Sequence, residues 1–415
     1  MTLARGIPPA HRGGDSLTAR FLRLATVRSS AIYAVTGVAF MVANVVLARA
    51  LPVADYATVT LAVALVGFGG LIGPLGQDRV LVRRNLAATP GLLAWGTAAS
   101  ASVGLVVGVV ATAVYGLGAS LAASLFLGAT AYAVGILAAA KLQSEGRFVH
   151  ATLVAQAPSP LLLAAALLLA GVGLAGAAEV AGLFAAGLAA VAAVTWRRLL
   201  AAAGPAPPAY RIDWSESLAL TGLGAMSALA ASFERLAIPL ALPGPALAEF
   251  GVLAALVVGP LRMLQLATQR TLTPRLRDAA SPAARRGLLL REAALLAGLT
   301  AAAGAVLWFA VPLAVPLLLG GKYDLPPALV AAALASGTAR VANGLATAAV
   351  TALSPRERLH LVNATGWVTL SLAVPAAWAG AAWGGLAGLV AAVAVVNLGQ
   401  AAALLALVLP SFRDR

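Results

Sequence analysis

The stretch Ala333–Ser354, ALASGTARVANGLATAAVTALS, places an arginine near the middle of a run of alanine, valine and leucine. The apolar run begins near Pro326, so about 14 residues, or roughly 21 Å of helix, lie on either side of Arg340. A helix of that length spans the hydrocarbon of a bilayer, with Arg340 at membrane depth. A guanidinium there costs at least about 2.5–3.5 kcal/mol, so we expect it to face a polar partner or a water-filled cavity.

The composition indicates which solvent surrounds the chain. Of the 415 residues, 61% are hydrophobic and only 10% are charged, whereas a soluble domain carries charge on about 25% of its residues. Apolar runs of about 20 residues, long enough to cross the hydrocarbon, recur along the sequence. The sequence therefore predicts an all-α polytopic membrane protein whose main environment is the lipid bilayer. The net charge of +14 is typical of basic cytoplasmic loops and does not indicate a nucleic-acid partner.

The order of apolar and basic segments predicts twelve transmembrane helices. They fall at residues 29–51, 57–76, 91–115, 118–140, 148–170, 174–196, 215–239, 246–269, 293–319, 326–353, 360–380 and 384–409. If the loops alternate between the two sides of the membrane, 24 of the 28 lysine and arginine residues lie on the same side. Because basic residues accumulate in cytoplasmic loops, both termini are expected in the cytoplasm.

The chain divides into two halves of similar length. An acidic–aromatic–small triplet opens the second span of each half, at Asp55 and again at Glu249. Six helices per half would give both repeats the same orientation in the membrane. The predicted division is a basic cytoplasmic tail (1–24), an N-lobe of six helices (25–200), a cytoplasmic linker (201–214) and a C-lobe of six helices (215–415).

One face of the helix around Arg340 is polar. At 100° per residue, an arc of about 80° holds Ser336, Arg340, Asn343, Thr347, Thr351 and Ser354. Such a stripe is expected to face a cavity between the lobes and to bind substrate. The structural alternative is that Arg340 only joins helices through backbone carbonyls.

The eighth span carries a second polar stripe. Arg262, Gln265, Gln269 and Thr273 share an arc of about 80°, and Arg270 lies beside them. Arginine and glutamine at helical spacing inside a membrane segment again indicate a cavity lining.

The ionisable groups of the spans are mostly cationic. Arg28 and Arg235 join the arginines of the two stripes, and Glu234 is the exception. Glu234 is expected to pair with Arg235 or with a partner on another helix, and it is the candidate for ion coupling. A cationic cavity suits an anionic substrate, and the planar guanidinium donates paired hydrogen bonds to phosphate.

Several other kinds of site are not expected. The chain has no cysteine, and its three histidines lie far apart, so no metal site or cofactor is predicted. The GxGxxG pattern at Gly171–Gly176 joins two membrane spans without a preceding strand, which argues against a nucleotide site. The predicted outer loops are too short to carry paired catalytic carboxylates, so an enzyme is not expected.

Three longer segments resemble a transporter family. They are VLARALPVADYATVTLAVALVGFGGLIGPLGQDRVLVRR (Val46–Arg84), SFERLAIPLALPGPALAEFGVLAAL (Ser232–Leu256) and LLLGGKYDLPPALVAAALA (Leu317–Ala335). In this order they resemble the polysaccharide and lipid-linked oligosaccharide flippases, of the O-antigen and teichoic-acid exporter type, in the multidrug/oligosaccharidyl-lipid/polysaccharide exporter superfamily. Ala57 departs from that pattern, which usually has glycine there.

The resemblance implies two six-helix lobes around a central V-shaped cavity and alternating access by rocking of the lobes. It implies transport of undecaprenyl-pyrophosphate-linked oligosaccharide across a bacterial cytoplasmic membrane, with other polysaccharide-assembly proteins as partners. Family members bind the pyrophosphate with cavity arginines. The matching positions here are Arg28, Arg235, Arg262 and Arg340, with Arg79 at the inner mouth.

Two other functions remain open. A cation-coupled multidrug antiporter of the same superfamily would need a buried carboxylate, and only Glu234 lies near mid-span. A membrane-embedded polysaccharide polymerase or ligase would need catalytic groups in its outer loops.

Overall fold

The computed structural model describes residues 15–172, 176–202, 214–354 and 359–412. These residues form helices joined by short turns, and none of them lies in a β-strand. In chain order the elements are α1 (Asp15–Ala50), α2 (Val53–Ile72), α3 (Gln77–Arg84), α4 (Pro90–Ala113), α5 (Ala119–Ser144), α6 (Phe148–Ala155), α7 (Pro158–Val172), α8 (Ala177–Ala201), α9 (Trp214–Ala241), α10 (Pro245–Leu253), the π-helix η1 (Ala254–Val258), α11 (Gly259–Asp278), α12 (Pro282–Leu319), α13 (Pro327–Leu353), α14 (Leu359–Val408) and the 3₁₀-helix η3 (Leu409–Phe412).

The helices of the described residues are long and apolar enough for the predicted membrane fold. Nine spans meet that test, and two further spans are bent pairs, α6 with α7 and the two halves of α9. Among these 11 segments α14 is counted once, although it consists of two helices joined at Gly384 and Gly385. Counting the two helices separately gives the predicted twelve spans. The predicted all-α polytopic fold is confirmed, and the chain is a multi-pass membrane protein.

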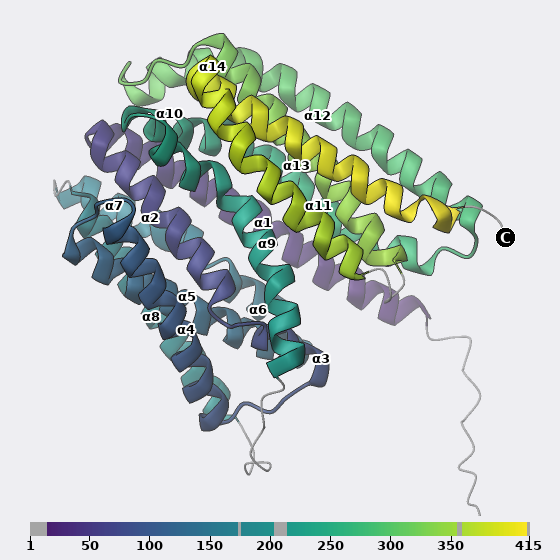
Figure 1. The fold of residues 1–415 in the computed structure, drawn as a ribbon. Helices are drawn as coiled ribbons and strands as arrows, with labels where there is room; N and C mark the ends of the chain where they lie inside the picture. Colours follow the sequence, from purple (N-terminus) through teal and green to yellow (C-terminus); the bar gives the residue numbers. More distant parts are fainter. Residues whose placement is uncertain (1–14, 173–175, 203–213, 355–358, 413–415) are drawn as a thin grey trace, which may run out of the picture.

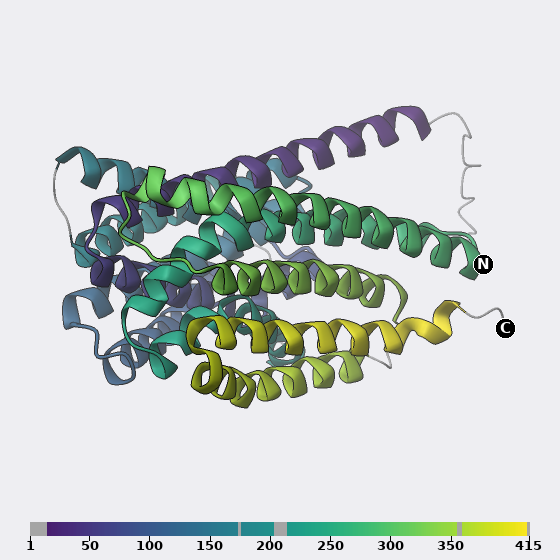
Figure 2. The ribbon, with the colours of Figure 1, turned by 90° about the horizontal axis from the view of Figure 1, so that it is seen from above.

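Helix α14 is a helical hairpin. Gly385 adopts φ 56° and ψ −139° at the turn, a conformation that glycine reaches without strain. The two legs approach so closely that a Cβ on Gly380 would lie 2.4 Å from the carbonyl oxygen of Gly388. Figure 2 shows the two legs side by side. The predicted spans 360–380 and 384–409 are these two legs.

Replacing Gly380 with alanine tests this contact. The added methyl group would overlap backbone atoms that cannot move aside, so we expect the free energy of unfolding to fall by about 1–3 kcal/mol. Gly304 in α12 is the matched control, because a Cβ there would meet no atom within 4 Å. Thermal unfolding in detergent should show a lower midpoint for Gly380→Ala and an unchanged or higher one for Gly304→Ala. Equal midpoints would contradict the hairpin packing.

Prolines interrupt two of the other spans. Pro158 begins α7, and the helix axis turns by 47° between α6 and α7. Pro260 follows η1, where the backbone N–H of Gly259 donates to the carbonyl of Ala254 five residues earlier. Because proline cannot donate to the helix ladder, the regular α-helical hydrogen bonding is interrupted near both residues. The polar stripe of the eighth span begins directly after this π-helix.

The helices pack in two groups, which lie in the lower and upper parts of Figure 1. In the first group α2, α4 and α8 pack against α5, and in the second α11, α12 and α14 pack against α13. Helix α2 contacts α9 and α10 across the boundary, while α1 contacts both α7 and α11. Helix α1 begins at Asp15, so residues 15–24 of the predicted tail are helical. The predicted linker lies mostly outside the described residues, which omit 203–213.

The hydrophobic cores show on which side the two groups are joined. The largest core contains residues from both groups, among them Leu47, Leu125, Leu253 and Leu329. Toward the ends that the charge pattern predicts to be cytoplasmic, which we call the inner side, each group has a core of its own. Trp196 belongs to the core of the first group and Leu272 to that of the second. The groups are therefore joined at the outer side and have separate cores at the inner side.

Tyrosines add polar contacts at the outer side. The Tyr323 hydroxyl donates to the carbonyl of Ala48 at 3.1 Å, and the Tyr115 hydroxyl donates to the carbonyl of Leu236 at 2.9 Å. The first bond joins α1 to the loop after α12, and the second joins the turn after α4 to α9. Burial raises the pKa of Tyr323, which lies in the loop after α12, to about 12. Its hydroxyl therefore remains a donor at neutral pH.

Candidate functional site

The structure identifies the partner of Arg340. Its Nη2 atom lies 2.7 Å from Oε1 and 2.6 Å from Oε2 of Glu234, which is on α9. The Ser336 hydroxyl also contacts Oε1 of Glu234, at 3.3 Å. Arg340 is 9% exposed, Glu234 is 1% exposed and Ser336 is fully buried. Of the partners that the sequence left open for Glu234, the one on another helix is therefore found, and the charge of Arg340 is neutralised.

Arg235 and Arg262 lie beside this ion pair. Arg262 is close enough to Arg340, Arg235 and Glu234 for their charges to interact. Within the described part of the chain, neither Arg235 nor Arg262 forms an ion pair. Three cations and one anion give this cluster a net charge of 3 − 1 = +2.

The charges of the cluster come from three helices, α9, α11 and α13. Glu234 and Arg235 are neighbours on α9, so their side chains point about 100° apart. Glu234 faces α13, whereas the Arg235 guanidinium lies 5.7 Å from the ring centroid of Phe40 on α1. Arg262 follows the π-helix on α11, and its side chain lies near that of Tyr132 on α5. The cluster therefore lies where the second group of helices meets the first.

The stripe residues Asn343 and Thr347, on the C-terminal side of Arg340, make contacts within the second group. The Asn343 amide donates to Oε1 of Gln400 on α14 at 2.6 Å, and the Thr347 hydroxyl donates to Oδ1 of Asn343 at 3.2 Å. Hydrogen bonds of this kind join transmembrane helices. Asn343 and Thr347 are thus engaged in helix packing, separately from the arginine cluster.

A substitution at Asn343 distinguishes packing from substrate binding. Asn343→Ala should lower the free energy of unfolding by about 0.6–2 kcal/mol, because it removes an interhelical hydrogen bond. The control is Thr338→Ala on the same helix, since Thr338 is exposed and donates only to its own backbone at Leu334. Thermal unfolding should separate the two variants, while transport by both stays close to that of the parent. Lost transport with unchanged stability would make Asn343 a binding residue.

The other predicted site residues lie in different places. Gln265 packs against Gly344 of α13, where a Cβ would lie 2.6 Å from Cγ of Gln265. Gln269 is half-buried on α11. Arg79 lies on α3 and donates to the carbonyl of Leu220 at 3.2 Å. Arg28 and Arg270 lie in α1 and α11, but their side chains are outside the described part of the structure.

The sequence interpretation missed two residues that lie next to the charged cluster. Tyr132 lies in an apolar run, where its hydroxyl was the only signal. Phe40 gave no signal, because an aromatic residue in a membrane helix is ordinary. In the part of the chain that the structure describes, no group of three or more histidine, cysteine, aspartate or glutamate residues could hold a metal ion.

Comparison with known proteins finds similarity in structure. No protein-family model matches the sequence, and no curated protein matches it. A multidrug resistance MATE family transporter of the MOP superfamily, in an inward-facing conformation, aligns with a TM-score of 0.64 over 93% of this chain and 98% of its own, at 14% identity. The lipid II flippase MurJ, in an inward closed conformation, aligns with a TM-score of 0.66 over 91% of this chain and 87% of its own, at 10% identity.

A third structure supports the same conclusion. The MATE multidrug transporter DinF-BH in complex with R6G aligns with a TM-score of 0.59 over 97% of this chain and 98% of its own, at 15% identity. These proteins are transporters or flippases. Over nearly its whole length, the chain has the fold that the MATE multidrug transporters share with the lipid II flippase MurJ.

Proposed function

We propose that the protein flips a lipid-linked oligosaccharide, carried on undecaprenyl pyrophosphate, across the bacterial cytoplasmic membrane by alternating access. Both termini would lie in the cytoplasm, and the substrate would enter from the inner side, where the two groups of helices have separate cores. The fold shared with MurJ and with the MATE transporters supports transport as the general activity.

The observation that carries the proposal is the pair of uncompensated arginines. Arg235 and Arg262 are half-buried within membrane spans, and neither forms an ion pair with a described residue. Cations at this depth are costly unless they serve a substrate or an ion pathway. Two guanidinium groups match the charge of a pyrophosphate and can each donate paired hydrogen bonds to its oxygens.

Arg340 has a different role in this proposal. The Glu234 carboxylate already occupies its Nη2 atom, but its Nε is buried and has no hydrogen-bond partner among the described residues. An orphaned buried donor costs about 1–3 kcal/mol. A phosphate oxygen bound beside Arg235 and Arg262 would supply the missing acceptor. The route from the inner side to this phosphate site would be lined by Gln265, Gln269 and Arg270 on α11, Arg28 on α1 and Arg79 on α3.

The alternative is a cation-coupled multidrug antiporter. The fold that the chain shares with the MATE transporters supports this function as well as it supports the flippase. An antiporter needs a carboxylate that is free to bind a proton or a sodium ion. Both oxygens of Glu234 are bound by Arg340 Nη2, so a tethered guanidinium occupies the position that a coupling cation would take. This contact favours the flippase.

The experiment uses the purified protein in vesicles. A fluorescent polyprenyl-pyrophosphate disaccharide is incorporated, and a membrane-impermeant reductant bleaches only the outer-leaflet label. The protein should accelerate exchange of this lipid between the leaflets, but not exchange of the matching polyprenyl alcohol, which lacks phosphate. Efflux of a cationic dye driven by a proton or sodium gradient, without lipid exchange, would replace the proposal with the antiporter.

A further inference from the structure

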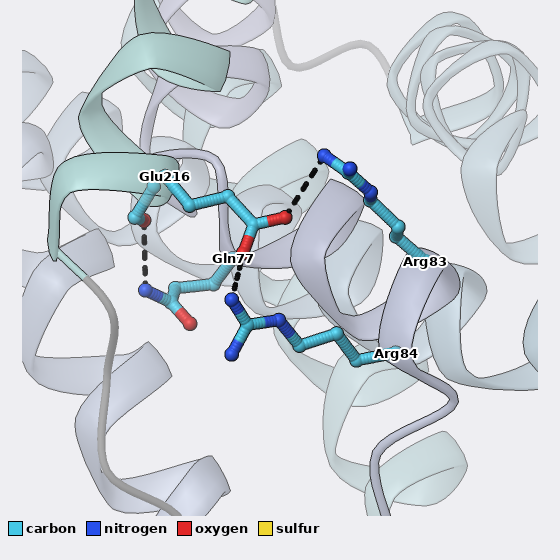
Figure 3. Close-up of polar contacts among 5 residues, drawn as sticks. Gln77, Arg83, Arg84 and Glu216 are labelled. Carbon is cyan, nitrogen blue, oxygen red and sulfur yellow. Dashed lines mark hydrogen bonds and ion pairs between the residues drawn. The ribbon is translucent and has the colours of Figure 1, made fainter.

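Helix α3 contacts the inner half of α9 through a set of polar side chains. The Glu216 carboxylate lies between two arginines of α3: its Oε1 is 3.1 Å from Nη1 of Arg83, and its Oε2 contacts Nη2 of Arg84. The amide of Gln77 donates to the Ser217 hydroxyl at 2.8 Å. Figure 3 shows Glu216 between the two arginines, with Gln77 beside them. We call these residues, together with Arg79, the α3–α9 clasp.

Backbone geometry brings the two helices this close. Gly76 precedes α3 with φ 75°, and a Cβ there would lie 2.2 Å from the carbonyl oxygen of Ser217. The Ser217 hydroxyl in turn donates to the carbonyl of Leu75. The side chains of Arg83 and Arg84 are 59% and 43% exposed, so water reaches this end of the molecule. The clasp is thus a polar contact at the inner membrane surface between the first and second groups of helices.

The opposite face of the inner part of α9 packs against α14. A Cβ on Gly366 of α14 would lie 1.6 Å from the sulfur of Met226, so Met226 is tightly packed there, and a Cβ on Gly222 would lie 3.8 Å from the side-chain nitrogen of Asn363. Helix α9 bends by 46° between its inner part, Glu216–Met226, and its outer part, Ala228–Ala241. The inner part of α9 therefore bridges α3, in the first group, and α14, in the second.

For the inner side to open, the inner part of α9 must separate from either α3 or α14. The ion pairs of Glu216 with Arg83 and Arg84 lie at an exposed surface, where such contacts exchange for contacts with water at a small net cost. The packing of Met226 against Gly366 has no such replacement, because its close van der Waals contacts are lost on separation. We propose that the α3–α9 clasp opens and closes once in each transport cycle, while the inner part of α9 stays with α14. This inference depends on the alternating access of the proposed function.

Paired cysteines test which contact opens, because the natural chain has no cysteine. Gln77→Cys with Ser217→Cys places two thiols across the clasp, and Met226→Cys with Gly366→Cys places two thiols across the α9–α14 contact. Cross-linking the clasp pair with a mild oxidant should stop exchange of the fluorescent lipid in vesicles, and reductant should restore it. Cross-linking the control pair should leave exchange unchanged. Continued exchange with a cross-linked clasp, or loss of exchange with the cross-linked control pair, would overturn the proposal.

A second measurement needs no substrate. A single Ser217→Cys should react slowly with a membrane-impermeant maleimide, because Ser217 is fully buried in the closed clasp. Combining it with Arg83→Gln and Arg84→Gln should raise the labelling rate by about five- to thirtyfold, and the corresponding lysine variants should raise it less. Arg291→Cys, at an exposed site on α12, should label equally in both backgrounds. Unchanged labelling of Ser217→Cys would refute the clasp. An increase without any lipid exchange would uphold the clasp and count only against the flippase.

Discussion

Glu234→Ala is expected to lower the free energy of unfolding by about 3–5 kcal/mol, since it leaves a buried guanidinium without its counter-charge. Arg340 is only 9% exposed and lies inside a membrane helix, so little water is available to replace the carboxylate in the protein without substrate. The amount of protein in the membrane should fall, and the midpoint of thermal unfolding in detergent should drop. Arg340→Ala should have a similar effect, because it leaves the Glu234 carboxylate buried and unpaired.

The double variant Glu234→Gln with Arg340→Gln is the matched control. It removes both charges at once, and replacing a complete buried ion pair with neutral residues is often close to neutral for stability. The double variant should therefore be more stable than either alanine variant. If both single alanine variants unfold at the same temperature as the parent, the ion pair is not the structural contact described here.

Replacing Arg235 and Arg262 together with glutamine should slow flipping of the fluorescent lipid by about 10²–10⁴-fold. Each charge-assisted hydrogen bond to the pyrophosphate contributes about 1.5–3 kcal/mol, and every 1.36 kcal/mol is a factor of ten in rate. Unlike Arg340, these two arginines form no ion pair with a described residue, and Glu234 keeps its partner Arg340 when they are removed. The thermal unfolding midpoint should stay at or above that of the parent.

The double lysine variant provides the control for the chemistry of the contact. Lysine keeps the positive charge but donates from a single point, so it cannot bind phosphate with a planar pair of hydrogen bonds. Flipping by Arg235→Lys with Arg262→Lys should lie between that of the parent and that of the glutamine variant. Parental rates in the glutamine variant would remove the arginine cluster from the transport pathway.

The polar stripe around Arg340 shows how far one helix can be interpreted alone. Ser336, Arg340, Asn343 and Thr347 do share a face of α13, and all four make polar contacts there. From the sequence, the whole stripe was predicted to line one cavity. In the structure Asn343 bonds to Gln400 on α14, while Arg340 bonds to Glu234 on α9. Periodicity fixes which residues share a face, but the neighbours of that face come from helices far away in sequence.

The membrane fold, the number of spans and the place of Arg340 midway along its helix were determined by the sequence itself, because length and hydropathy are local properties of each segment. The helical hairpin of α14 and the bend between α6 and α7 also had local causes in glycine and proline. Only the tertiary structure decided that Glu234 neutralises Arg340 while Arg235 and Arg262 stay unpaired, and that α3 reaches Glu216. Those outcomes depend on how each helix is rotated and which helix lies beside it, and packing between distant segments sets both.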